Sequence, residues 1–361
     1  MPSHESASGN LYCLVRWRTS FFHDAMSRYF LSVSPMLQRV FMPENAIALH
    51  GTIYVVLFRP VKGLLSDYFF VPTLTALVNV PIFKVSTPQE KPMKICRCLT
   101  EDGQIHYGLH SSETSGIMQV LEGDIFNSLK PTDKYLKIIA YLSPVAPPNI
   151  FALGFSYRKH ADEIGTDVSP YPVVFIKANT SVTGHDTNIL LPAAGPDHVD
   201  YEGELAVIIG KAGKNIKTSE AMNHVLGYTC ANDVSARDWQ FEKQKGQWTR
   251  GKGFDTFCPL GPCLVTRDEI PDPNRLSIRT MINDLVVQDA STASMIYDIA
   301  TIVSDLSHSL TLLPGTVILT GTPEGVGFTR HPPLFLMEGD RVTVTIEGIG
   351  TLTNAVQREP V

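Results

Sequence analysis

The pattern of apolar and polar positions along the 361-residue chain changes near residue 93. After that point, short apolar segments alternate with clusters of Gly and Pro, which predicts strands separated by turns. The segments Lys94–Leu99 and Gln104–Leu109 flank the turn Glu101-Asp102-Gly103 and predict a β-hairpin. Further predicted strands are Ile150–Gly154, Pro172–Lys177, Glu204–Gly210, Ser277–Ile282, Thr316–Thr320 and Arg341–Ile346.

Helical patterns are few and short. The predicted helices are Ser156–Ile164, Ser219–His224, Ser235–Lys245 and Asp298–Leu310. Strands and helices together predict an α+β fold that is mainly β, with a large sheet at its core. We expect a small β-rich domain over residues 93–145 and a catalytic domain over residues 146–361.

Residues 1–92 form an atypical N-terminal extension. Residues 11–41 contain four arginines and a single acid, Asp24, which is typical of an organelle-targeting presequence. A disordered extension is the alternative. Two apolar stretches follow, Ala46–Phe58 and Tyr68–Phe83. The first is shorter than the roughly 20 residues of a membrane span and the second contains two prolines, so a membrane anchor is disfavoured.

Charge and cysteine content narrow the class of protein. Thirty basic and 36 acidic residues give a net charge of −6. Nucleic acid is therefore not expected as a partner, because the chain has no basic stripe to neutralise phosphates. The six cysteines show neither a CxxC pair nor a zinc-ligand spacing. We expect reduced thiols and an intracellular location, cytoplasmic or mitochondrial.

Three acidic residues lie next to apolar segments. Glu202 and Glu204 lead into a predicted strand, where alternation places them on one face. Asp233 follows the apolar segment Val225–Ala231. Carboxylates without a His or Cys partner suit Mg²⁺ or Mn²⁺, with Ca²⁺ as a third candidate. The alternatives are a solvated strand face for the glutamates and a helix N-cap for Asp233.

A histidine and a lysine add candidate chemistry. His160 and Glu163 are three positions apart, so on a helix the carboxylate can orient the imidazole as a general base. A surface pair without function is the alternative. Lys252 lies between two glycines and could neutralise an enolate or carboxylate, or could be an ordinary turn lysine. Thr322 lies in a tight turn that could bind a carboxylate or simply reverse the chain.

The order of these segments resembles the fumarylacetoacetate hydrolase superfamily over residues 93–356. The segments that carry the resemblance are Ala152–Glu163, Val174–Lys177, Asp200–Gly210, Asn232–Gln240, Gln247–Pro262 and Thr320–Gly327. The chain is most similar to the fumarylacetoacetate hydrolase domain-containing proteins, which include acylpyruvate hydrolases and oxaloacetate decarboxylases or tautomerases. The resemblance implies a β-sandwich roll preceded by a small β-rich domain, and a homodimer.

The resemblance also implies roles for individual residues. The implied metal ligands are Glu202, Glu204 and Asp233. The implied catalytic residues are the dyad His160 and Glu163, on a mobile lid, and Lys252. The implied substrate-binding residues are Lys177, Gln240 and Thr322. Phe155 and Ser156 depart from the Arg and Asn of many acylpyruvate hydrolases, which leaves the distal group of the substrate open.

The predicted function is that of a Mg²⁺-dependent enzyme acting on a small β-diketo or 2-oxo acid. The main prediction is hydrolysis of a C–C bond in an acylpyruvate or a fumarylacetoacetate-like acid, with an enolate as leaving group. Tautomerisation or decarboxylation of oxaloacetate is the first alternative, since the same enolate can be reprotonated or can form by loss of CO₂. A metabolite-binding relative without catalysis is the second alternative.

Overall fold

The structure is a computed structural model, and it describes residues 47–49, 52–54, 94–109 and 116–360. The chain divides into two compact units, Met1–Thr87 and Pro88–Val361. In the first unit, β1 (Ile47–Leu49) pairs with β2 (Thr52–Tyr54) in antiparallel fashion. The predicted targeting segment lies outside the described residues. No helix of the part that the structure describes is long and apolar enough to cross a membrane.

The second unit is mainly β, as predicted. Its strands are β3 (Lys94–Thr100), β4 (Ile105–Leu109), β5 (Ile117–Asp124), β6 (Ser128–Leu142), β7 (Ile150–Gly154), β8 (Val173–Ile176), β9 (Val182–Thr183), β10 (Asn188–Leu191), β11 (Val199–Asp200), β12 (Gly203–Ile209), β13 (Val225–Asn232), β14 (Ser235–Ala236), β15 (Cys258–Thr266), β16 (Ser277–Ile282), β17 (Leu285–Ser291), β18 (Val317–Leu319), β19 (Arg341–Ile346) and β20 (Gly350–Arg358). Its helices are α2 (Arg158–Ile164), α3 (Thr218–Ala221), α4 (Thr249–Lys252), α5 (Ile299–Ser309) and a π-helix over Asp238–Lys243, with 3-10 turns at Asn179–Ser181, Met222–His224, Arg267–Glu269, Pro273–Arg275 and Thr292–Ser294.

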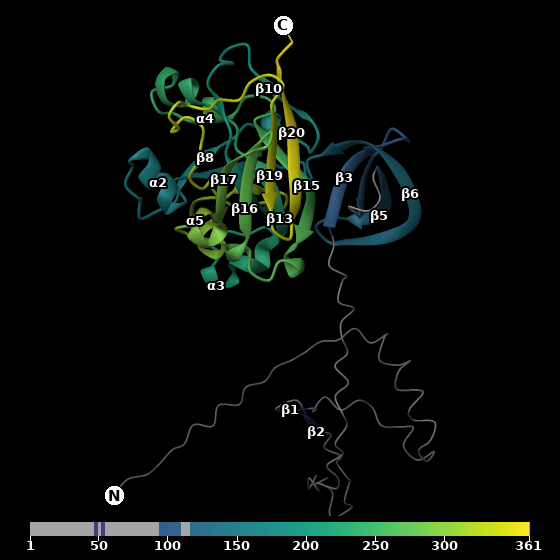
Figure 1. The fold of residues 1–361 in the computed structure, drawn as a ribbon. Coiled ribbons are helices and arrows are strands. Elements are labelled where there is room, and N and C mark those ends of the chain that lie inside the picture. The colour runs from purple at the N-terminus through teal and green to yellow at the C-terminus, as the bar shows by residue number, and fades with distance from the viewer. Residues whose placement is uncertain (1–46, 50–51, 55–93, 110–115, 361) are drawn as a thin grey trace, which may run out of the picture. The chain divides into compact units, whose positions relative to one another are not determined.

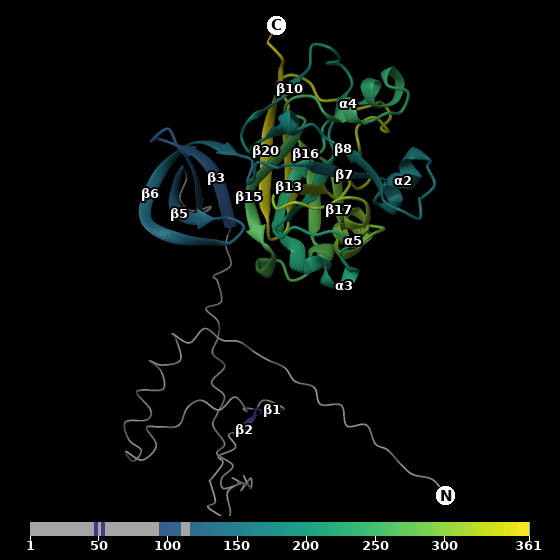
Figure 2. The ribbon, with the colours of Figure 1, turned by 180° about the vertical axis from the view of Figure 1, so that it is seen from behind.

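Two large sheets build the body of this unit. The longer sheet runs in the order β4-β5-β6-β3-β15-β13-β12-β18-β7-β8, with β9 paired to β15. The second sheet runs in the order β10-β20-β19-β16-β17. Figure 1 shows β16, β19 and β20 in front of β13, and Figure 2 shows the same unit from behind. In both views α2 lies at the side of the body away from β3, β5 and β6.

Strand β12 is central because it is buried on both faces. Leu205, Val207 and Ile209 face a core cluster that also contains residues of β16, β19 and α5. Ala206 and Ile208 face the opposite cluster, which contains residues of β7 and β18. A strand with two covered faces needs a continuous apolar run rather than strict alternation. The acids at the start of β12 are therefore carried into the interior by the strand itself.

Several predicted elements agree with the structure. The hairpin is confirmed by the pairing of β3 with β4, and β7, β16 and β19 have the predicted bounds. The helix predicted over Ser235–Lys245 is wrong at its start, because Ser235 and Ala236 form a short strand. Only Asp238–Lys243 is helical there, and it is a π-helix. Asp233 is therefore not the N-cap of a helix, which was the alternative interpretation.

Candidate active site

Three buried carboxylates meet at the ends of two paired strands. Glu202 directly precedes β12, Glu204 lies within it, and Asp233 directly follows β13. The strands pair with Gly203 opposite Asn232, so their acid-bearing ends lie side by side. One carboxylate oxygen from each of the three acids lies within 4.8 Å of the others. Their burial contradicts the alternative of a solvated strand face.

Three cations neutralise two of these acids. The Lys252 Nζ lies 2.7 Å from Glu202 Oε2 and 2.7 Å from Asp233 Oδ2. The Arg237 Nη1 lies 2.7 Å from Glu202 Oε1, and the Lys177 ammonium donates to Asp233 Oδ1. Lys252 is only 2% exposed, so it is not an ordinary turn lysine. The three cations compensate the buried charges of Glu202 and Asp233, which would be costly to bury unpaired.

Glu204 is the acid of the cluster that is not paired with these three cations. Its Oε2 accepts a hydrogen bond of 2.6 Å from the Gly321 backbone N–H, but its Oε1 is buried without a partner in the described part of the chain. Burial and the charges of Asp233 and Glu202 raise the pKa of Glu204 well above its ordinary value. Burial also opposes ionisation of Glu202, but Lys252 and Arg237 outweigh it and lower its pKa to about 2.

The donor set fits a divalent cation. A buried carboxylate oxygen without a partner, close to two further carboxylates, is the arrangement that hard cations such as Mg²⁺ occupy. Asp200 adds a fourth buried acid, since its Oδ2 accepts a hydrogen bond of 2.9 Å from Arg237 Nε. When all four carboxylates are ionised, as ligation of a cation by Glu204 would require, they leave one net negative charge against the three cations. A divalent cation would make the site net positive and favourable to anionic ligands.

The histidine and glutamate of the predicted dyad are in contact. Both lie on α2, and His160 Nδ1 is 3.2 Å from Glu163 Oε2. Glu163 also accepts hydrogen bonds from the Gly325 N–H at 3.1 Å and from the Thr329 hydroxyl at 2.8 Å. Burial raises the pKa of Glu163, but these three donors outweigh it and lower the pKa below its ordinary value. A carboxylate held in this way fixes the imidazole with Nε2 as the acceptor.

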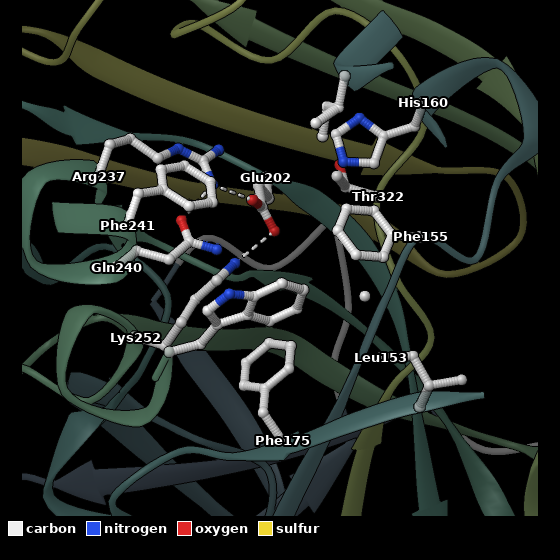
Figure 3. A pocket seen from close by; sticks show the side chains of 13 residues that line it. Leu153, Phe155, His160, Phe175, Glu202, Arg237, Gln240, Phe241, Lys252 and Thr322 are labelled. Atoms are coloured by element: carbon white, nitrogen blue, oxygen red, sulfur yellow. Dashed lines mark hydrogen bonds and ion pairs between the residues drawn. The ribbon is translucent and has the colours of Figure 1, made fainter. Parts of the chain in front are cut away.

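One pocket encloses about 350 Å³ of space, part of it open to solvent, and its lining includes His160, Glu202, Arg237 and Lys252. The lining does not include Glu163, Glu204 or Asp233. Figure 3 shows Glu202, Arg237, Gln240 and Lys252 at one side of the pocket. His160 and Thr322 lie at another side, close to Phe155. The pocket is lined by Leu153, Gly154, Phe155, His160, Ile164, Phe175, Glu202, Arg237, Gln240, Phe241, Trp248, Lys252 and Thr322.

Three residues predicted to bind substrate have different positions. Gln240 and Thr322 line the pocket, whereas the pocket residues named above do not include Lys177. The Gln240 Oε1 accepts a hydrogen bond of 2.8 Å from Arg237 Nη1, which leaves its amide NH₂ for a ligand. Thr322 donates to the Gly203 carbonyl at 3.0 Å. Lys177 is fully buried against Asp233, so its position indicates that it holds this acid in place, and contact with substrate stays a prediction.

Arg237 is the main residue that the sequence analysis missed. Its guanidinium binds Asp200, Glu202 and Gln240, and it stacks 4.3 Å from the ring centre of Phe328. An arginine in the middle of an expected helix gives no signal, because it is usually solvated on the outer face. The informative signal was its place four residues after Asp233, inside a segment that already carried the resemblance.

Comparisons with known proteins match the segment of the chain that contains this pocket. Residues 149–357 match the family model described as fumarylacetoacetate (FAA) hydrolase, C-terminal. A fumarylacetoacetate hydrolase domain-containing protein 2 homolog from Dictyostelium discoideum is 42% identical over 257 residues, 64% of this chain and 84% of that protein. The human protein named oxaloacetate tautomerase FAHD2A, mitochondrial, is 45% identical over 219 residues, 60% of this chain and 69% of that protein.

Solved structures give the same fold. The structure of 5-carboxymethyl-2-hydroxymuconate delta-isomerase from Mycobacterium smegmatis matches with a TM-score of 0.65 and 39% identity, covering 74% of this chain and 100% of that one. The structure of 2-hydroxyhepta-2,4-diene-1,7-dioate isomerase from Mycobacterium marinum matches with a TM-score of 0.63 and 39% identity over the same shares. Both of these proteins are named as isomerases.

Proposed function

Because the chain belongs to the fumarylacetoacetate hydrolase family, we propose that it is a Mg²⁺-dependent enzyme that interconverts the keto and enol forms of oxaloacetate or a close 2-oxo acid. The observation that carries the proposal is the ordered His160–Glu163 pair at a pocket that is also lined by Arg237, Lys252 and Glu202, one of the three acids of the carboxylate cluster. The names of the relatives favour tautomerisation over C–C hydrolysis, which the family alone would also permit.

The proposed ligand set for the metal is Glu202, Glu204 and Asp233. A bound Mg²⁺ supplies a Lewis acid that polarises the carbonyl oxygen of the substrate. The protein contributes two cations on the same side of the pocket, Arg237 and Lys252, which suit the carboxylates of a small dianion. An ammonium group has three N–H donors, and Lys252 uses two of them on Glu202 and Asp233. The third can stabilise negative charge that develops on the substrate oxygen.

The proton transfer is assigned to His160. Its Nε2 takes a proton from the carbon next to the carbonyl, C3, and the electron pair of that C–H bond becomes the C2–C3 double bond. The C2–O π pair moves onto the carbonyl oxygen, which then takes the proton from the His160 imidazolium. This completes the enol and regenerates the neutral base, and the reverse sequence regenerates the ketone. Glu163 stabilises the transient imidazolium because it already accepts from Nδ1. Burial of His160, which is 5% exposed, excludes competing water from the base.

The test compares wild type with His160→Ala. Oxaloacetate prepared as the enol is followed by its ultraviolet absorbance with and without Mg²⁺, while pyruvate formation reports decarboxylation and an acylpyruvate reports C–C hydrolysis. We expect wild type to tautomerise the enol and His160→Ala to lose about 10²–10⁴-fold in rate, the usual contribution of a general base. Lys159→Ala changes the neighbouring position, whose side chain is 73% exposed, and should keep the wild-type rate. Equal rates in His160→Ala and wild type would exclude this mechanism.

Two further properties are proposed on the relatives alone. The names of the vertebrate relatives include the word mitochondrial, which supports a mitochondrial location for this chain. The homodimer expected from the resemblance is proposed on the same basis, and light scattering of the purified protein measures it.

A further inference from the structure

The pocket is lined by charged and by aromatic side chains, which meet where the Lys252 Nζ lies 5.1 Å from the centre of the Phe175 ring. The charged groups that line it, apart from the dyad, are Glu202, Arg237 and Lys252, and Figure 3 shows them together. The aromatic residues Phe155, Phe175 and Trp248 also line the pocket. Trp248 contacts both phenylalanine rings, with ring centres 5.2 Å from Phe155 and 5.4 Å from Phe175. These three rings form what we call the aromatic wall.

The backbone at the aromatic wall is built to hold these rings. Phe155 has φ of 55°, in the left-handed region that a bulky side chain rarely adopts. Its ring meets the Trp248 indole edge to face, with an interplanar angle of 81°. A Cβ at Gly154 would lie 2.4 Å from the indole Cζ3, so glycine is required for the indole to sit there. Strained residues that persist in a pocket indicate a functional constraint at that point.

The position of the base decides which part of a substrate meets this wall. The enolising carbon must come within reach of His160 for proton transfer. Figure 3 places Phe155 between His160 and the lower end of the pocket, on the side away from Arg237 and Gln240. One substituent of that carbon can point to the cations, where a second carboxylate would be neutralised. Another substituent points to the Phe155 ring, which is half-buried and offers no charge.

We propose that Phe155 and Trp248 form an apolar subsite for an uncharged alkyl or aryl substituent on the enolising carbon of the 2-oxo acid. The proposal rests on the proposed function, because His160 fixes where this carbon lies. Phe155 is then a specificity-determining residue. The subsite admits a carbon substituent beside, or in place of, the second carboxylate that the cationic side receives.

The experiment is calorimetric titration of the full-length protein with Mg²⁺, using phenylpyruvate and pyruvate as probes. The two acids share the 2-oxo acid head and differ only in a phenyl group on the enolising carbon. Covering part of one phenyl ring should make phenylpyruvate bind about tenfold more tightly than pyruvate. Phe155→Gly removes the ring and permits the same backbone conformation, so the preference should fall to about twofold or less. Phe155→Asn, which tolerates the left-handed region, should behave alike if the glycine variant does not fold.

A matched control comes from the other side of the pocket. Phe241 also lines it, is 38% exposed and stacks on Phe328 rather than on Trp248. Phe241→Ala should therefore leave the ratio of the two dissociation constants unchanged. Equal binding of both acids to wild type, or a tenfold preference that survives Phe155→Gly and Phe155→Asn, overturns the subsite. A phenylpyruvate preference in a protein that does not tautomerise oxaloacetate would overturn the proposed function and leave the subsite standing.

Discussion

At the scale of single residues, the three acids of the carboxylate cluster, the proposed metal ligands, are not equivalent. Glu202 and Asp233 are each paired with buried cations, whereas Glu204 has one oxygen without a partner in the described residues. Sequence reasoning treats the acids alike, because spacing shows only that carboxylates come together. The acid that is destabilised by the negative charge of its neighbours is the one without a cationic partner. The cationic partners come from distant parts of the chain, as Lys177 and Lys252 show.

This difference predicts opposite effects on the stability of the metal-free protein. Burial, then Asp233 and Glu202, raise the pKa of Glu204, so its protonated form is stabilised by folding. That stabilisation is present below the unfolded pKa of about 4.3 and is lost as pH rises through the raised pKa. With chelator at pH 8, Glu204→Gln should therefore melt above wild type, and the difference should shrink on acidification. The glutamine oxygen can keep the bond from Gly321 N–H.

Asp233→Asn is the contrasting variant. It removes the charge that faces Lys177 and Lys252, both fully or nearly buried, and should cost about 3–5 kcal/mol of unfolding free energy. Thermal melts measure both effects, and addition of Mg²⁺ should stabilise wild type but neither variant. A Mg²⁺-induced shift of wild-type size in both variants would remove these acids from the metal site.

At the scale of elements, a loop is hydrogen-bonded to the helix that carries His160, the proposed base. Residues 321–330 donate to Glu163 on α2 through the Gly325 N–H and the Thr329 hydroxyl. The same loop donates to Asp200 through the N–H groups of Gly327 and Phe328, at 2.8 and 3.0 Å. Asp200 in turn binds Arg237 in the pocket. The dyad and the cationic side of the pocket are therefore fixed by one stretch of backbone.

These hydrogen bonds to Glu163 predict a graded effect of Thr329. Thr329→Val keeps the shape and loses the hydroxyl, so Glu163 loses one of its donors and should orient His160 less well. One hydrogen bond contributes about 0.5–1.5 kcal/mol, which corresponds to a fall in kcat of about 2–12-fold. The Mg²⁺-induced rise in Tm should be unchanged, because Thr329 does not contact the carboxylate cluster. Thr329→Ser retains the hydroxyl and should restore kcat, and a serine variant as slow as the valine variant would argue against a role for this hydrogen bond.

Some strands and helices of this fold could be predicted from the sequence, and others could not. Strands with continuous apolar runs, such as β7 and β12, are visible because both of their faces are buried. Strand β6, Ser128–Leu142, was missed because it is largely exposed and carries polar side chains along most of its length. The π-helix was missed because its period differs from that of an α-helix, although Gln240 within it lines the pocket. Local patterns singled out the three acids, His160, Glu163, Lys252 and Thr322 as candidates, whereas Lys177 and Gln240 came only from the resemblance. The partners that these residues contact across the fold could not be predicted.

At the scale of the whole molecule, the small β-rich domain is joined to the catalytic body by a shared sheet. Strand β3 pairs with β15, with Ile95 opposite Leu264 and Lys94 opposite Val265. Strands β4, β5 and β6 continue the same sheet beyond β3. The boundary predicted between residues 145 and 146 therefore falls inside a continuous sheet. A cut at that point would expose the edge of β15 and the apolar side chains that cover it.

The predicted boundary near residue 92, unlike the one at residue 145, lies close to the division between the two compact units. The structure divides the chain between Thr87 and Pro88, and every residue of the pocket lies between Leu153 and Thr322. A unit of this length can bury a core large enough for independent folding. A chain that begins at Lys91 should therefore retain the melting temperature, the Mg²⁺-induced stabilisation and the tautomerase rate of the full chain, each within about twofold in rate or 1 kcal/mol in free energy.

A second truncated chain, which lacks the strands β3 to β6, is the contrast to the chain that begins at Lys91. A chain that begins at Pro144 lacks β3 through β6 and should be insoluble or melt far lower, since it removes strands that cover β15 and the core residue Ile95. If the Lys91 chain behaves like the Pro144 chain, residues 1–92 contribute to the core and the predicted boundary is wrong. If only the Pro144 chain fails, the catalytic unit begins at the sheet that β3 shares with β15, and the N-terminal extension serves a purpose other than catalysis.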